Sequence, residues 1–124
     1  MNQSIDKALS EASKLAIENP DVLVSLYKLD NHCLYASPSH EEITGYTSSD
    51  MVGHHWAEFV VKSDRAHGDL AGNDALLNGE SVEFGVRIAH KAGGTVNVRG
   101  TVHLIHDSEG QDSYLLFQAS VVPD

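Results

Sequence analysis

The chain has 124 residues, enough for one domain with a hydrophobic core of its own. It carries 8 Lys and Arg against 18 Asp and Glu, which gives a formal net charge of −10 at pH 7. Because nucleic acids are polyanions, this charge argues against a nucleic-acid partner, and it is typical of a readily soluble domain. No run is long or apolar enough to cross a membrane, and the N-terminus lacks the layout of a signal peptide. We therefore expect a cytoplasmic domain with no membrane partner, and a membrane-bound parent protein stays compatible with it.

The first segment, residues 1–19, is predicted to form an amphipathic helix that stops before Pro20. Its apolar residues recur at three- and four-residue steps and therefore form one stripe. The stripe consists mostly of small side chains, so it can pack closely on a second copy of the chain or fold back on its own domain. We predict a dimerisation helix, with the fold-back as the alternative. The interface residues that we expect are Ile5, Leu9, Ala12, Leu15 and Ala16.

Two strands of a hairpin are predicted next. Residues 22–29 are rich in β-branched and aromatic side chains, residues 33–36 form a shorter run, and residues 30–31 are a turn signal between them. Two short helices then follow, because capping residues recur and Gly45 and Gly53 each end a helix.

A longer helix is predicted over residues 64–78, where a terminal Asn-Gly pair ends the pattern. Ala66, Leu70 and Leu77 share one side of this helix, and we expect that side to face the core. Two internal glycines lower the helix propensity, and they indicate either a close approach to a neighbour or a flexible helix.

The last forty residues are predicted to form three strands. Apolar and polar residues alternate over 82–89 and again over 96–104, with a turn at 92–94, which indicates antiparallel strands with one buried face. Residues 114–122 are apolar nearly throughout, as in a central strand. The sequence thus predicts an α+β domain over residues 20–124. In it, short helices cover one face of a five-stranded antiparallel sheet, and the N-terminal helix flanks the domain.

Three motifs stand in order along this domain. Residues 35–53 contain Ser-Pro, then Glu-Ile-Thr-Gly-Tyr and a final glycine; residues 64–65 read Asp-Arg; residues 87–93 contain Arg and then Lys-Ala-Gly. In this order and spacing they resemble the PAS family of bacterial signal-transduction domains, over about residues 20–122. The resemblance implies a sensor that binds a small ligand, dimerises, or does both, and so regulates an attached histidine kinase, cyclase or transcription factor. Since a PAS unit seldom acts alone, we expect a C-terminal effector domain and a longer parent protein.

The resemblance also implies a ligand site between the long helix and the inner face of the last three strands. The alternation independently places Phe84, Val86 and Val102 on that face, where each is alternatively a plain core residue. Gly100 interrupts the apolar set and either leaves room for a ligand or permits a close helix approach. The pocket residues that we expect are Trp56, Phe59, Leu70, Asn73, Leu77, Phe84, Val86, Val98, Gly100, Val102 and Leu116.

The resemblance leaves the cofactor unidentified. Haem-binding PAS sensors carry a histidine on the long helix, where His67 is the only candidate, about 90° around the helix from the apolar stripe. The flavin photosensors of the superfamily carry a reactive cysteine after the short helices, whereas Cys33 lies on the early hairpin, so no flavin–cysteine adduct is expected. Non-covalent flavin binding stays open, with Trp56 able to stack on the ring.

No catalytic or metal site is expected. The eight histidines show no spacing of a closed zinc site, and the sequence has neither a nucleophile elbow nor a phosphate-binding loop. A small isomerase or hydratase, the enzymatic alternative, needs an ionisable pair deep in its cavity, but the inner strand positions are apolar. A ligand-free interaction domain with a filled core is the other alternative. The single cysteine excludes an internal disulfide and fits a reducing compartment.

Overall fold

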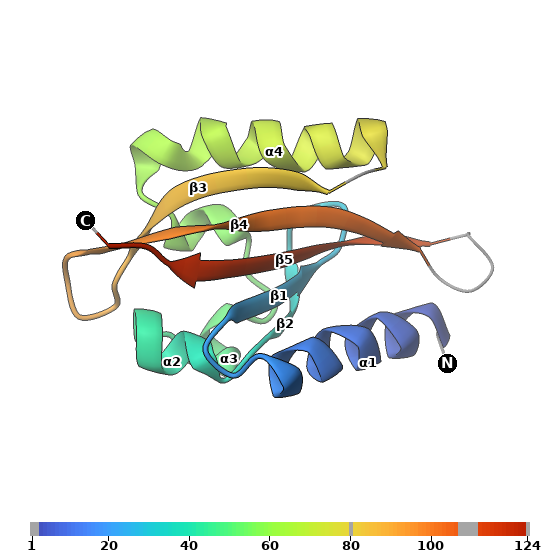
Figure 1. Cartoon of the computed structure of the whole chain (residues 1–124), viewed down its shortest axis with the longest axis horizontal. Coiled ribbons are helices and arrows are strands. Elements are labelled where there is room, and N and C mark those ends of the chain that lie inside the picture. Colours follow the sequence, from blue (N-terminus) through green and yellow to red (C-terminus); the bar gives the residue numbers. More distant parts are fainter. Residues whose placement is uncertain (1–2, 80, 107–111, 124) are drawn as a thin grey trace.

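A computed structural model describes residues 3–79, 81–106 and 112–123 of the chain, with side chains from Asp6 onwards (Figure 1). Five strands form one antiparallel sheet in the order β2-β1-β5-β4-β3, which confirms the predicted fold class and the central position of the last strand. The strands are β1 (Leu23–Tyr27), β2 (Cys33–Ala36), β3 (Val82–Ala89), β4 (Thr95–His106) and β5 (Ser113–Val121).

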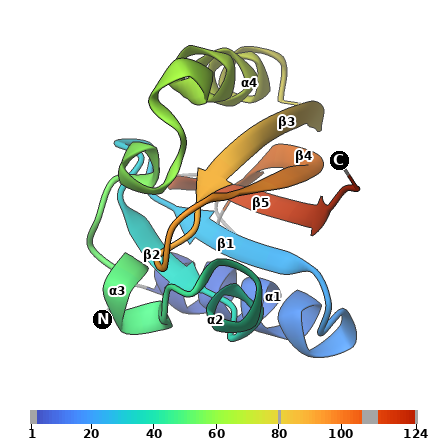
Figure 2. The ribbon, with the colours of Figure 1, turned by 90° about the vertical axis from the view of Figure 1, so that its left-hand side faces the viewer.

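Helices lie on both sides of this sheet, and Figures 1 and 2 show α4 and α1 opposite each other with the sheet between them. No helix in the described part of the chain is long and apolar enough to cross a membrane. The helices are α1 (Gln3–Glu18), α2 (Ser39–Thr44), α3 (Ser48–Met51), the 3-10 helices η1 (Trp56–Phe59) and η2 (Lys62–Asp64), and α4 (Arg65–Asn78).

The main core lies between the inner face of the sheet and the segment from α2 to α4. Strand register creates this face, because β3 and β4 pair so that Val86 stands opposite Val98, and β1 and β5 pair so that Leu23 stands opposite Ala119. Residues of one strand alternate between faces, so the intervening residues of β1 and β5 point to the other side. The sheet is therefore buried on both faces along these two strands.

The second core lies under α1, on the outer face of the sheet. Ala8, Ala12 and Ala16 follow one another at four-residue steps and pack against Val24 and Leu116. Ala12 is 0% exposed, so the helix lies against the strands at the distance that only a small side chain permits. The structure thus shows the fold-back that the sequence left open as an alternative.

This packing changes the expected dimer surface. Ala12 and Ala16 are buried within their own chain, and Leu9 and Leu15 are partly buried against the same cluster, so none of them presents the free stripe that a dimer through this face needs. Ile5 lies outside the described side chains. The stripe is covered because the outer faces of β1 and β5 are apolar, so the helix packs against its own domain.

The prediction for the face of α4 is wrong. Leu70 is 63% exposed and Leu77 83% exposed, whereas the residues that face the core are Gly68, Ala71, Gly72 and Ala75. A Cβ atom on Gly68 would lie 2.7 Å from Cη2 of Trp56, so the helix is too close to its neighbours for leucine on that side. Because α4 lies so close to the core, glycine and alanine occupy its inner side, and the two leucines lie on its exposed side.

Candidate ligand cavity

A cavity of about 70 Å³ lies in the main core, between the inner face of the sheet and the helical segment. A space of this volume is larger than one water molecule, so it can admit a molecule of a few non-hydrogen atoms. The residues that line it come from four strands and from the helical segment that runs from α2 to α4. They are Leu23, Ser25, Tyr27, His40, Thr44, Tyr46, Met51, Trp56, Phe59, Val60, Gly68, Phe84, Val86, Ile88, Val98, Phe117 and Ala119.

The structure brings together five of the residues predicted for the pocket, namely Trp56, Phe59, Phe84, Val86 and Val98. Phe84, Val86 and Val98 come from β3 and β4, as the strand alternation implied, whereas Trp56 and Phe59 come from η1. The two phenylalanines pack in edge-to-face contacts: Phe84 lies 5.4 Å from Phe117, and Phe59 lies 4.8 Å from Tyr46, measured between ring centroids. Such contacts hold the aromatic walls of the cavity in fixed positions.

The other expected pocket residues lie elsewhere. Leu70 and Leu77 face solvent, and Asn73 borders a smaller hollow beside α4. Leu116 belongs to the cluster under α1, because its register opposite Leu26 turns it to the outer face of the sheet.

Two expected pocket residues of β4 also lie outside the cavity lining. Val102 is fully buried in the main core but does not border the cavity. A Cβ atom on Gly100 would collide with the backbone carbonyl of Gln118 on β5. This glycine therefore serves the close approach of two strands, and neither a ligand nor a helix occupies the space of its missing side chain.

The polar part of the lining was not among the residues predicted for the pocket. Ser25 and Tyr27 alternate with the outward residues of β1, and His40 and Thr44 lie on α2, all of them buried. The sequence signal that was available is the alternation within residues 22–29, which puts a serine and a tyrosine on one face. This signal is weak because the whole strand is buried, since the sheet is covered on both sides there.

His40 has a defined hydrogen-bonding state. It is 4% exposed, and its Nδ1 lies 3.0 Å from the carbonyl oxygen of Ser37 and 3.2 Å from the Ser37 hydroxyl. Burial lowers the pKa of His40, and the hydrogen bond with Ser37 offsets this only in part. The side chain is therefore a neutral imidazole near pH 7, anchored through Nδ1.

Burial also holds two other side chains of the core, Tyr27 and Cys33, in their uncharged forms. Burial raises the pKa of Tyr27 far above its usual value, although a hydrogen bond with Ser25 acts in the opposite direction. Burial likewise raises the pKa of Cys33 to about 11. Cys33 donates to the carbonyl of Tyr35 and does not line the cavity, so it is an unreactive thiol and no partner for a ligand there.

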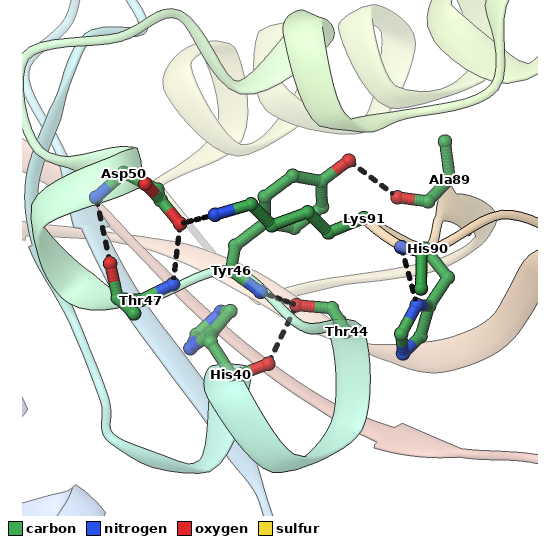
Figure 3. A network of polar contacts seen from close by, with 9 residues as sticks. His40, Thr44, Tyr46, Thr47, Asp50, Ala89, His90 and Lys91 are labelled. Carbon is green, nitrogen blue, oxygen red and sulfur yellow. Dashed lines mark hydrogen bonds and ion pairs between the residues drawn. The ribbon is translucent and has the colours of Figure 1, made fainter.

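A set of contacts, here called the hairpin clasp, ties the turn between β3 and β4 to the segment between α2 and α3 (Figure 3). The Tyr46 hydroxyl donates to the carbonyl of Ala89 at 2.7 Å, and the Lys91 backbone N–H donates to the carbonyl of Thr44 at 3.0 Å. The Lys91 ammonium pairs with Asp50 at 2.9 Å and lowers the pKa of that carboxyl. Because Thr44 and Tyr46 line the cavity, the clasp fixes that part of its wall.

The candidate for a haem ligand is not at this site. His67 is exposed on α4 and borders a separate surface hollow with Glu83 and Arg99. It is therefore not placed to bind an iron in the cavity. Among the described residues no group of three or more His, Cys, Asp or Glu side chains is arranged to hold a metal ion.

Comparison with known proteins agrees with this arrangement. A family model described as the PAS fold matches residues 33–116. The PAS domain of a Colwellia psychrerythraea protein is 17% identical, with a TM-score of 0.75 over 88% of this chain and 95% of its own. PAS-B of Drosophila melanogaster Cycle, solved with bound ethylene glycol, is 14% identical, with a TM-score of 0.73 over 81% and 99%.

A third similar structure is the N-terminal domain of a Marinobacter aquaeolei diguanylate cyclase with a PAS/PAC sensor. It is 18% identical, with a TM-score of 0.68 over 81% of this chain and 94% of its own. No curated protein matches the chain. At these identities the structural similarities show a shared fold, and they leave the ligand to be argued from the residues of this chain.

Proposed function

Because the chain belongs to the PAS fold family, whose members are typically sensory or signalling modules, we propose that it is a sensor that binds a small molecule in its core cavity. The observation that carries this proposal is the composition of the cavity lining. Aromatic and aliphatic walls surround the space, and buried serine, threonine, tyrosine and histidine side chains face the same space. Apolar walls with a few converging polar groups are typical of small-molecule sites, whereas a filled structural core has neither the space nor the polar groups.

The solved structure of Cycle PAS-B supports a ligand of this size. That protein was found with ethylene glycol, and its W398A variant was found with glycerol. Both are molecules of a few non-hydrogen atoms, and the cavity of the present chain has a volume of about 70 Å³.

The signal is proposed to pass through the sheet to α1. Ser25 borders the cavity from the inner face of β1, while its neighbours Val24 and Leu26 contact the α1 cluster on the outer face. A ligand that binds one arrangement of β1 more tightly than another shifts the population of that arrangement, and α1 senses the shift. The homodimer, the C-terminal effector and the cytoplasmic location predicted from the sequence belong to this same proposal.

Catalysis by the domain is not part of the proposal. An isomerase or hydratase needs a titratable pair whose pKa values suit proton transfer near neutral pH. His40 is a buried titratable group in the cavity, but the described lining contains no Asp, Glu, Lys or Arg to act with it. Burial also raises the pKa of Tyr27, another group of the lining, far above neutral.

The test is to identify what the purified protein carries. The protein is denatured in organic solvent and the released small molecules are quantified by mass spectrometry, alongside a visible absorption spectrum of the folded sample. We expect one small molecule per chain after growth in rich medium, and none from an Ala119→Leu variant, whose added side chain fills the cavity. Absence of any released compound, together with no binding from a library of small fragments, would instead favour a ligand-free interaction domain.

A further inference from the structure

His40 is buried and lines the cavity, and one of its two ring nitrogens has no hydrogen-bond partner among the described residues. His40 makes its contacts with Ser37 through Nδ1, and no described residue forms a hydrogen bond with Nε2. No fully enclosed side-chain nitrogen or oxygen in the described part of the chain lacks a partner, so Nε2 must border open space. Of the three hollows described above, His40 borders only the cavity, and we infer that Nε2 faces this space.

The partner of Nδ1 fixes the chemistry of Nε2. A backbone carbonyl accepts hydrogen bonds but cannot donate them, so the contact with the Ser37 carbonyl places the ring hydrogen on Nδ1. The Ser37 hydroxyl accepts a hydrogen bond from the backbone N–H of Val24 and forms another with the Ser39 hydroxyl at 2.6 Å. These two bonds fix the position of Ser37 beside the imidazole ring. In a neutral imidazole with hydrogen on Nδ1, Nε2 is an acceptor. The cavity therefore presents one lone pair to a donor.

The rest of the lining limits the occupant to an uncharged molecule. The described lining has no Asp, Glu, Lys or Arg, and a charge without a partner in such a site is strongly disfavoured. The volume sets the size, because a cavity of about 150 Å³ binds benzene and this one measures about 70 Å³. The occupant is therefore smaller than benzene.

We propose, resting on the function proposed above, that the cavity selects an uncharged molecule smaller than benzene that donates one hydroxyl or N–H hydrogen bond to Nε2 of His40. The aromatic rings of Phe84 and Phe117 contact its apolar part. Thr44 assists by position, since its hydroxyl donates to the His40 backbone carbonyl at 2.7 Å and holds this turn of α2. A molecule of the same shape that lacks the donor leaves the lone pair buried and unpaired, and it binds more weakly.

The experiment compares pyrrole with furan, two five-membered rings of nearly equal size of which only pyrrole carries an N–H donor. The ¹⁵N-labelled protein, stripped of any ligand, is titrated with each probe, and binding is followed on the backbone amides of the cavity lining. We expect pyrrole to bind about tenfold more tightly than furan. The ¹⁵N resonance of His40 Nε2 should move to lower frequency with pyrrole and stay in place with furan, a readout that needs no variant.

Two matched variants assign the difference to His40. His40→Phe keeps a ring in the cavity wall but removes the acceptor, and it should bind the two probes equally. His67→Phe makes the same change on the exposed face of α4 and should keep the preference for pyrrole. If His40→Phe fails to fold, the probe ratio and the Nε2 resonance of the original protein still decide the question.

The outcomes separate this inference from the function on which it rests. Equal binding of pyrrole and furan in the cavity, or a preference that survives in a folded His40→Phe protein, overturns the ligand class and leaves a ligand-binding sensor. Failure of both probes to shift any cavity amide overturns the ligand class and counts against the ligand-binding function as well.

Discussion

Gly68 and Gly72 lie one turn apart on α4 and are both buried, but they differ in what surrounds them. A Cβ atom at Gly68 would lie 2.7 Å from the indole of Trp56, which is itself buried in the core. A Cβ atom at Gly72 would meet nothing within 4 Å. Substitutions at these two positions therefore test how closely α4 approaches Trp56, with Gly72 as the control for Gly68.

We predict opposite effects of alanine at these positions. Gly68→Ala should lower the free energy of unfolding by about 1–3 kcal/mol, because the added methyl group displaces a packed ring. Gly72→Ala should raise it by about 0.5–1 kcal/mol, because alanine favours helix and finds free space. Urea denaturation measures both, and equal effects of the two changes would show that Trp56 does not pack on Gly68 as described.

His40 makes the stability of the fold depend on pH. Its pKa is lowered from the ordinary value of 6.5 by burial. As pH falls below that value the unfolded chain takes up a proton at this residue before the folded chain does, so stability is lost as pH falls. This loss of stability occurs at higher pH than the titration of Asp50 and Asp64, because hydrogen bonds lower the pKa values of both carboxyls.

We predict that His40→Phe flattens the pH dependence of unfolding just below pH 6.5. Urea midpoints taken at a series of pH values test this. A slope unchanged by His40→Phe would mean that this histidine titrates alike in the folded and unfolded chain.

At the scale of elements, the hairpin clasp combines a surface ion pair with a partly buried hydrogen bond. Lys91 and Asp50 are both substantially solvent-exposed, and ion pairs of that kind contribute little to stability. The bond from Tyr46 to the Ala89 carbonyl is partly buried, so its loss leaves a carbonyl without its donor.

The clasp should therefore depend on the tyrosine. We predict that Tyr46→Phe lowers the free energy of unfolding by about 0.5–1.5 kcal/mol. Lys91→Met should have a much smaller effect. Amide hydrogen exchange in residues 89–94 should speed up in the first variant and not in the second. The reverse order would show that the ion pair holds the turn between β3 and β4.

In the molecule as a whole, α1 covers the outer face of β1 and β5, so the sheet is buried on both faces along these two strands. Ala12 is 0% exposed beneath this helix, so a larger side chain there has no space. We predict that Ala12→Leu lowers the free energy of unfolding by about 1–3 kcal/mol, independently of protein concentration. Lys14→Leu, on the exposed side of the same helix, is the control. A loss that depends on concentration would instead place Ala12 in a dimer interface.

The sequence predicted the order of the elements, the five strands and the central position of β5, because two-residue alternation and turn residues are local signals. It misjudged the face of α4, because Leu70 and Leu77 look like a core stripe when the closeness of Trp56 to Gly68 is unknown. It also missed Ser25 and His40, because their burial follows from neighbours distant in the sequence. Strand alternation identified the cavity walls on β3 and β4, whereas the polar lining required the packed structure.

Nuclear Overhauser contacts between bound pyrrole and labelled methyl groups show whether the ligand lies in the core cavity. Val86 and Val98 line the cavity, whereas Leu70 and Leu77 lie on the exposed face of α4. We expect contacts with the two valines and none with the two leucines. Contacts confined to the leucines, or the absence of contacts with Val86 and Val98 at saturating pyrrole, would contradict a ligand site in the core cavity.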